Sequence, residues 1–384
     1  MKFLNLNNKY KILLGLFFTL LLTSLWSNNI YVLVLFSLLA YFVLPNNQLW
    51  DTTSLLLLSF SFIYSIILLI TGQVLSYFIV FAYLLAPVAF YRLGRWLVHV
   101  YRTDDQRNEI LFIIILLYLT PLFILTIKDI LAVGLVNIDR AMTGHINTEG
   151  ALSATYYGLL SSVGLGCLSA FFAKGQKLSI RIGYILVALF SLLVVVHLVN
   201  RSGLIIGVLI LITATLWVSR RNFSKSIKIV LLLLLIGLLM YQSEIFNETI
   251  FNAYQSRETG SSYDSVEFGG RLTLWVNAVS KVFTSPFGWT QNSYAHNYLL
   301  DTARVGGWIP FILLLVATCG WIKYFLKLIK KEYSPFVLYL ICISISIFLS
   351  MMVEPVLDCS ILYFSLFTMF WGMTRDLSTE KNFN

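Results

Sequence analysis

The sequence predicts an all-α integral membrane protein with about 12 transmembrane helices and one long loop outside the membrane. Hydrophobic residues make up 58% of the 384-residue chain and charged residues only 12%, whereas soluble domains carry about 25% charged residues. Long runs also lack charge almost entirely, and each approaches the roughly 20 residues with which a helix crosses the hydrocarbon core. Helices are required there because lipid cannot satisfy open backbone groups.

The spans are predicted from apolar runs between polar or glycine-rich breaks. In chain order they are 11–26, 30–44, 54–71, 74–91, 110–127, 151–173, 182–199, 203–218, 227–242, 308–326, 335–353 and 360–374. The first has a basic flank, as a signal peptide has, but the second follows at once and no small-residue cleavage site stands out. We therefore interpret residues 1–384 as a single polytopic membrane domain with its first span retained.

The placement of basic residues predicts the orientation, because Lys and Arg gather in cytoplasmic loops. With the amino terminus inside, 20 of the 27 Lys and Arg residues fall in inner segments, and 11 of the 18 acidic residues fall in outer segments. Both termini are then cytoplasmic, and residues 242–307 form a polar outer loop. The net charge of +9 reflects this orientation and attraction to anionic lipid, so we expect no nucleic acid as partner.

A few basic residues break the orientation rule, and most of them are arginine. They are Lys128, Arg140, Arg201, Arg257, Arg271, Lys281 and Arg304. A guanidinium matches phosphate oxygens two at a time, so these arginines suit a diphosphate held at the membrane surface. The alternative is that each one reaches to the interface or pairs with a nearby acid. Arg201 lies where two spans meet with almost no loop, a position typical of a functional residue, and His197 is interpreted as a satisfied histidine between helices.

Two helices are predicted in the outer loop. From Arg271 to Phe283 apolar residues recur every three or four positions, which indicates an amphipathic helix in the interface with Trp275 as its anchor. That face places Arg271 at the height of the lipid headgroups. A turn at 285–288 follows, and a second helical pattern starts near Tyr294. The polar stripe of this second helix holds Asn297, Asp301 and Arg304, with His296 at its leading edge.

These residues resemble the O-antigen ligase and O-antigen polymerase superfamily. The resemblance covers the span layout and roughly the second two-thirds of the chain. Arg140-x-x-x-Gly144-x-x-Asn147 is similar to the family's R-x-x-G-x-x-x-x-N element, with the Asn one position early. The other similar motifs are Asn200-Arg201-Ser202-Gly203, Gly270-Arg271…Trp275, Ser285-Pro286-Phe287-Gly288, His296-Asn297…Leu300 and Gly306-Gly307.

The resemblance implies a glycosyltransferase type C-like enzyme that uses an undecaprenyl-diphosphate-linked oligosaccharide as donor, with no metal, cofactor or nucleotide. It implies the bacterial inner membrane, with the active site facing the periplasm. Membrane lipid and a chain-length regulator or other polysaccharide-assembly proteins are the further partners that it implies. The sequence contains no H-E-x-x-H and no G-x-x-x-x-G-K motif, in agreement with that expectation.

The expected site residues follow from this chemistry. Arg201 and Arg271 are expected to hold the diphosphate, because a leaving group of this kind needs positive charge. His296 is expected to orient or deprotonate the acceptor hydroxyl, since an imidazole titrates near neutral pH; a purely structural role is the alternative. Further substrate contacts are expected at Arg140, Asn297, Arg304 and Trp275.

Three functions stay open. A polymerase joins lipid-linked repeat units, and a ligase moves the finished glycan onto the lipid A core; the acceptor separates them. We favour the polymerase because the outer loop is fairly short. A flippase or transporter of lipid-linked oligosaccharide would need charged groups deep in several spans or repeated halves, and neither is evident in the sequence.

Overall fold

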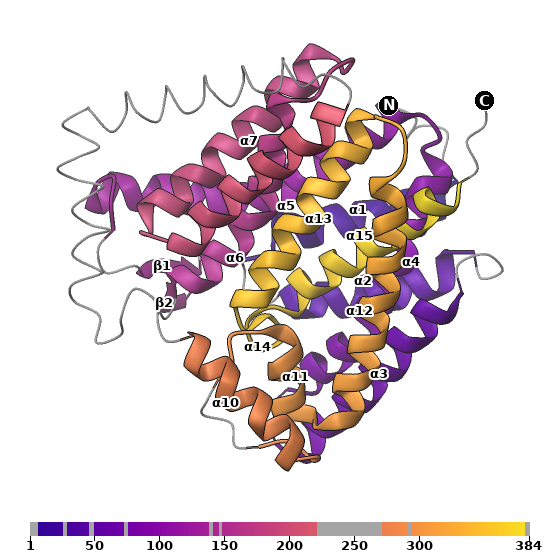
Figure 1. Ribbon diagram of the computed structural model, residues 1–384, viewed down its shortest axis with the longest axis vertical. Coiled ribbons are helices and arrows are strands. Elements are labelled where there is room, and N and C mark those ends of the chain that lie inside the picture. Colours follow the sequence, from indigo (N-terminus) through magenta and orange to yellow (C-terminus); the bar gives the residue numbers. More distant parts are fainter. Residues whose placement is uncertain are drawn as a thin grey trace. The chain divides into compact units, whose positions relative to one another are not determined.

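The computed structural model describes residues 7–25, 29–45, 50–72, 76–137, 141–145, 148–220, 271–289 and 294–380. Figure 1 labels the helices and strands along the chain. The chain divides into two compact units. Unit 1 comprises Met1–Arg107, Thr273–Glu332 and Met351–Asn384, and unit 2 comprises Asn108–Leu272 and Tyr333–Ser350. A few residues of α5, α10 and α13 continue from one unit into the other.

The regular elements among the described residues of unit 1 are all helices. Its helices are α1 (Asn8–Leu22), α2 (Asn29–Val43), α3 (Thr52–Ile70), α4 (Tyr77–Val100), α10 (Arg271–Thr284), α11 (Tyr298–Gly306), α12 (Trp308–Ile329), α14 (Val356–Cys359) and α15 (Ile361–Thr379).

Unit 2 combines helices with one hairpin. Its elements are α5 (Asp104–Val133), β1 (Ala141–His145), β2 (Thr148–Ser153), α6 (Ala154–Leu165), the 3₁₀ helix η2 (Gly166–Phe171), α7 (Leu178–His197), the helix Arg201–Arg220 and α13 (Pro335–Val353). The strands are antiparallel, with Met142 opposite Leu152, and they are the only strands in the part of the chain that the structure describes.

The protein is a helical membrane protein. Seven of the described helices are long and apolar enough to cross a membrane: α3, α4, α5, α7, Arg201–Arg220, α12 and α13. The predicted span 227–242 lies outside the described residues, and α1 and α2 have only 15 residues each. A total of about 12 spans therefore stays a prediction.

The predicted span 151–173 differs from the structure. Strand β2 takes its first residues, and α6 changes to the 3₁₀ helix η2 at Gly166. A Cβ atom added at Gly166 would lie 2.4 Å from the Cα atom of Ile343 in α13. The two backbones are therefore in contact at this point, and a hydropathy pattern does not report such a contact.

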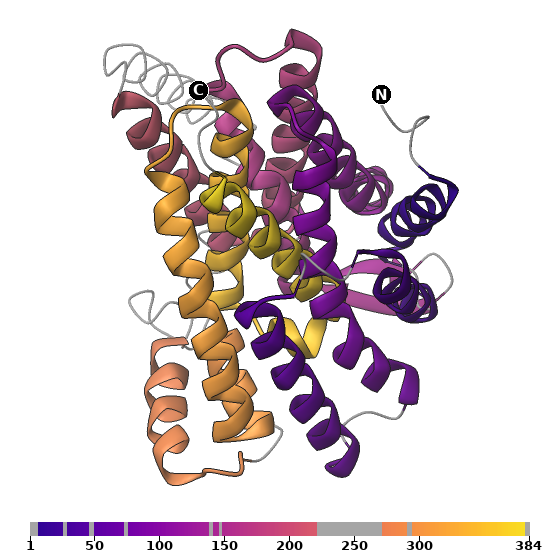
Figure 2. The same cartoon turned by 90° about the vertical axis from the view of Figure 1, so that its right-hand side faces the viewer.

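Helix α15 forms the centre of unit 1 and packs against α4, α12 and α14 (Figure 2). All residues from Ile361 to Thr374 are buried, as expected of a helix that is apolar on every side. A Cβ at Gly94 would lie 2.0 Å from the carbonyl oxygen of Met369, and a Cβ at Gly372 would lie 2.1 Å from that of Tyr91. Helices α4 and α15 therefore meet backbone to backbone.

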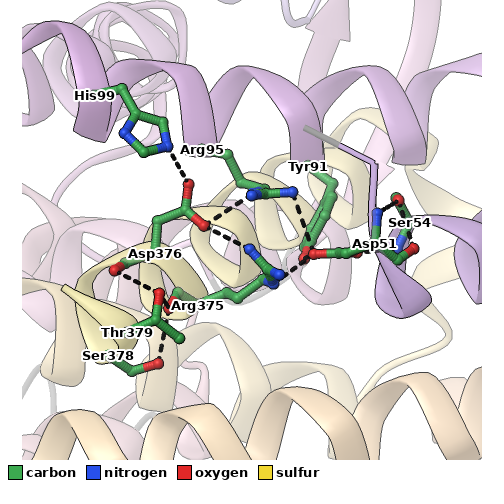
Figure 3. A network of polar contacts seen from close by, with 9 residues as sticks. All are labelled: Asp51, Ser54, Tyr91, Arg95, His99, Arg375, Asp376, Ser378 and Thr379. Atoms are coloured by element: carbon green, nitrogen blue, oxygen red, sulfur yellow. Dashed lines mark hydrogen bonds and ion pairs between the residues drawn. The ribbon is translucent and has the colours of Figure 1, made fainter. Parts of the chain in front are cut away.

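A cluster of charged side chains joins the start of α3 to the ends of α4 and α15 (Figure 3). Asp51 Oδ2 lies 2.5 Å from Arg375 Nε and 3.3 Å from Arg95 Nη1. Asp376 Oδ1 lies 2.9 Å from Arg95 Nε and 2.8 Å from Arg375 Nη1. His99 Nε2 lies 2.9 Å from the other oxygen of Asp376. Each carboxylate thus faces both guanidiniums.

The contacts in this cluster stabilise the ionised form of the Asp376 carboxyl. Burial alone raises the pKa of the Asp376 carboxyl, but the contacts with His99 and Arg95 more than offset it, so the pKa lies below its ordinary value. Asp376 is therefore an anion at neutral pH, and the cluster sets the carboxyl groups of Asp51 and Asp376 against two guanidiniums.

Replacing Asp376 with alanine is expected to destabilise unit 1, because it takes away one of the two carboxyl groups that face Arg95 and Arg375. Removing one partner of a buried ion pair costs about 3–5 kcal/mol. Thermal unfolding of the purified protein in detergent measures the loss. Asp105→Ala removes an exposed acid from α5 and should not change the melting temperature. An Asp376→Ala protein that melts like the wild type would show that the cluster adds no stability.

Candidate functional site

His296 lies in a short loop before α11 and has a left-handed backbone, with a φ of +52°. This conformation costs a non-glycine residue about 1–2 kcal/mol. The carboxylate of Asp301 holds it in place, since Oδ1 accepts from the Ala295 N–H at 2.8 Å and Oδ2 accepts from the Asn297 N–H at 3.0 Å. One buried carboxylate therefore bonds the amides on both sides of His296.

Asn297 and Arg304 support the same loop. The side-chain oxygen of Asn297 caps α11 by accepting from the N–H groups of its second and third residues, and Nδ2 donates to the Met352 carbonyl at 3.2 Å. Arg304 is only 2% exposed. Its Nε donates to Asp301 Oδ1 at 3.2 Å, and its guanidinium lies 4.8 Å from the centre of the Tyr294 ring. Both side chains, predicted as substrate contacts, are engaged by the protein itself.

The imidazole of His296 has one buried and one accessible side. The side chain is 30% exposed, but Nδ1 is inaccessible and lies 3.7 Å from Oε2 of Glu354. Glu354 directly follows α13 and is 3% exposed. The accessible part of the ring therefore lies away from Nδ1, and a ring placed in this way can accept a proton from a bound hydroxyl group.

Replacing Asp301 with asparagine is expected to loosen this loop, because one carboxylate oxygen becomes an NH₂ group that faces a backbone N–H. A buried donor left without its acceptor costs about 1–3 kcal/mol. The melting temperature in detergent should therefore fall, whereas Asp105→Asn on the exposed start of α5 should leave it unchanged. An unchanged melting temperature for Asp301→Asn would mean that the carboxylate does not hold the loop.

The helix predicted from Arg271 to Phe283 is present as α10. Leu272, Val276, Val279 and Phe283 are exposed along one stripe, which is the spacing of an apolar helix face. Trp275, predicted as the anchor of this face, is half-buried, and its indole nitrogen is inaccessible. Arg271 is half-buried at the first position of the helix.

The turn after α10 is fastened to the start of α12. Trp308, the first residue of α12, donates from Nε1 to the Val282 carbonyl at 2.5 Å and from its backbone N–H to the Pro286 carbonyl at 2.9 Å. Gly307 has a φ of +70°, and a Cβ there would lie 2.2 Å from the Pro286 oxygen. Phe287 is 94% exposed at the tip of this turn. The C-terminal end of α10 therefore lies beside the beginning of a candidate membrane span.

Arg201 belongs to unit 2, where it opens the helix Arg201–Arg220 and is half-buried. The preceding Asn200 acts as a cap, since its Oδ1 accepts from the Ser202 hydroxyl at 2.8 Å and from the Gly203 N–H at 3.0 Å. Its Nδ2 donates to the Ala154 carbonyl at 3.2 Å. A Cβ at Gly158 would lie 1.8 Å from that nitrogen, so Asn200 fits only against glycine.

His197 fixes the end of α7 just before this turn. It is completely buried, with Nδ1 bonded to the Leu135 carbonyl oxygen at 3.0 Å and Nε2 bonded to Asp129 Oδ2 at 2.8 Å. Asn137 also donates to Asp129 Oδ2, at 2.8 Å. Both ring nitrogens are therefore bonded within the protein, as the structural interpretation of His197 expects.

The turns at Arg201 and at His296 share a backbone feature. Among the described residues, Val199 and His296 are the only non-glycine residues with a positive φ, and each directly precedes the asparagine that caps a helix. A β-branched residue in this region is a genuine outlier. Backbone strain of this kind persists only where the surroundings impose it, and it gathers at functional sites.

The predicted site residues are thus distributed over both units. His296, Asn297 and Arg304 come together in unit 1, where the structure adds Asp301 and Glu354 to them. Arg140 lies outside the described residues. Glu354 was not predicted as a site residue, although an acid at the end of an apolar span is the kind of signal that marks function. No group of three or more His, Cys, Asp or Glu side chains in the described ranges is arranged to hold a metal.

A scan against protein-family models finds no match to this chain, and a search of curated proteins finds no similar sequence.

Proposed function

We propose that the protein is a membrane glycosyltransferase that joins glycans carried on a polyprenyl diphosphate, on the outer face of the bacterial inner membrane. The observation that supports this most is the pair of strained, capped turns at Val199 and His296. Each turn carries a motif that resembles the O-antigen polymerase and ligase superfamily, and backbone strain is typical of functional sites.

In the proposed reaction, the acceptor hydroxyl oxygen bonds to the anomeric carbon of the donor sugar. The bond from that carbon to the diphosphate oxygen breaks, and its electron pair leaves with the diphosphate. The hydroxyl proton passes to His296, which acts as a general base. Arg201 and Arg271 stabilise the anionic leaving group, because fixed guanidiniums are strongest where charge develops.

The other residues have supporting roles in this proposal. Asn297 and Arg304 position the loop of His296, since their polar groups already bond to protein atoms. Arg140 and Trp275 stay assigned to substrate binding. The exposed stripe of α10 lies in the lipid interface, where amphipathic helices bind, and brings Arg271 to the level of a lipid-linked diphosphate.

A polymerase and a ligase would share this site, and the acceptor decides between them. A flippase would carry charge deep within several spans. In the seven candidate spans the charged residues lie within the first two or the last three turns of the helices, and Arg92 of α4 is the one farthest from a helix end. This distribution favours chemistry at a membrane surface over transport, and we favour the polymerase.

Deletion of the gene, followed by analysis of the surface glycan, tests the function. A polymerase predicts single capped repeat units in the deletion strain and long chains again after complementation. Long chains stranded on the carrier lipid would indicate a ligase, and repeat units trapped on the inner face would indicate a flippase. A surface glycan of normal length and amount would contradict all three assignments.

A further inference from the structure

The carboxylate of Glu354 lies behind the buried nitrogen of His296. Glu354 is 3% exposed, and its Oε2 and His296 Nδ1 are both inaccessible to solvent and 3.7 Å apart. An ionised carboxylate is costly to bury unless a positive or hydrogen-bonding group faces it. The imidazole of His296 can carry a positive charge and can donate a hydrogen bond.

Two hydrogen bonds fix this approach within unit 1. The side chain of Asn297, the residue after His296, donates to the carbonyl of Met352 at 3.2 Å. The N–H of Val356 donates to the carbonyl of Glu354 at 3.0 Å, which turns the chain after α13. The segment that carries the histidine and the segment that carries the acid are therefore tied to each other.

We propose that Glu354 is a positioning residue that acts through His296, an inference that rests on the proposed glycosyl transfer. The bond made by one ring nitrogen decides which nitrogen carries the proton. A carboxylate that faces Nδ1 keeps the proton there and leaves the lone pair of Nε2 for the acceptor hydroxyl. When Nε2 takes the proton, the carboxylate of Glu354 faces the charged imidazolium and stabilises it.

The separation of 3.7 Å is longer than a formed hydrogen bond. Catalytic hydrogen bonds are often long without substrate and tighten to about 2.6–3.2 Å in the complex. A shift of roughly 0.5 Å closes the distance to the upper end of that range. In this arrangement the Glu354 carboxylate orients the His296 imidazole, and the imidazole acts as the base on the nucleophilic hydroxyl of the acceptor.

A double-mutant cycle on the full-length protein in proteoliposomes tests this role. Turnover of a purified lipid-linked repeat unit gives kcat and KM for Glu354→Gln, Glu354→Asp, His296→Asn and the Glu354→Gln/His296→Asn double variant. We expect Glu354→Gln to lower kcat by about 10²-fold with KM unchanged, a typical contribution of acid–base catalysis. Glu354→Asp should recover part of the loss, because it keeps the charge.

The double variant separates a role through His296 from a merely structural one. When two residues act as one unit, the effects of their substitutions on kcat are not additive. Glu354→Gln should therefore cause no further loss of kcat in the His296→Asn protein. Two results would overturn the role of Glu354 and leave the proposed reaction standing. One is a further loss of kcat in the double variant. The other is a wild-type kcat for Glu354→Gln beside an inactive His296→Asn protein. Full turnover by His296→Asn would instead overturn the proposed reaction at this site. If Glu354→Gln does not fold, Glu354→Asp takes its place in the cycle under the same criteria.

Discussion

Replacing His296 with asparagine is expected to lower glycan transfer by about 10²–10⁴-fold, the usual contribution of a general base, while the protein stays folded. Asparagine has no basic nitrogen, but it tolerates a left-handed backbone better than most residues. The bonds from Ala295 and Asn297 to Asp301 should therefore survive. His296→Ala should lose as much activity and be less stable, because alanine has no preference for a φ of +52°.

Surface glycan length in a complemented deletion strain and turnover in proteoliposomes both measure this loss. His99→Asn is the matched control, because His99 lies in the charged cluster with Asp376 and is 49% exposed. That variant should transfer glycan like the wild type. Normal turnover by His296→Asn would remove the imidazole from the reaction and leave its loop with a structural role alone.

Replacing Gly372 with alanine is expected to cause a large loss of stability. The new Cβ would lie 2.1 Å from the Tyr91 carbonyl oxygen, and this neighbour is backbone, so α4 and α15 must move apart. Gly94→Ala acts from the other helix, because its Cβ would lie 2.0 Å from the Met369 oxygen. Overpacking a close-packed interior costs about 1–3 kcal/mol and occasionally more, and we expect both variants at the upper end.

Gly15→Ala in α1 is the control for these two variants. No atom lies within 4 Å of the position of its Cβ, and alanine favours a helix over glycine by up to about 1 kcal/mol. Thermal unfolding in detergent should give a melting temperature equal to or above that of the wild type for Gly15→Ala and clearly lower ones for Gly94→Ala and Gly372→Ala. Equal melting temperatures for all three would contradict the direct packing of α4 on α15.

The positions of most helices could be predicted from the sequence, because hydropathy and helical periodicity are local signals. The helix predicted from Arg271 to Phe283 is α10, Arg271–Thr284. The same signals do not show where two backbones meet. Within the predicted span 151–173 the helix changes to a 3₁₀ helix at Gly166, where the backbone of α13 approaches, and hydropathy does not report a contact with a segment so far along the chain.

The candidate site could be predicted only in part. The motifs predicted His296 as a site residue, and helical periodicity placed Asp301 and Arg304 on a polar stripe. Periodicity did not show which groups cover that stripe. In the structure Tyr294 and the backbone around His296 cover it. Glu354 approaches His296 from the end of another helix, α13. The spacing of residues in the sequence does not predict a contact between segments so far apart in the chain.

The central claim is that the site transfers glycan from a polyprenyl diphosphate. The most direct measurement incubates the purified protein in proteoliposomes with a lipid-linked repeat unit and follows glycan length and released polyprenyl diphosphate together. We predict that new linkages and released diphosphate form in equal amounts and that Arg201→Ala loses both. Chain growth without release of the diphosphate, or equal rates for Arg201→Ala and the wild type, would contradict the account.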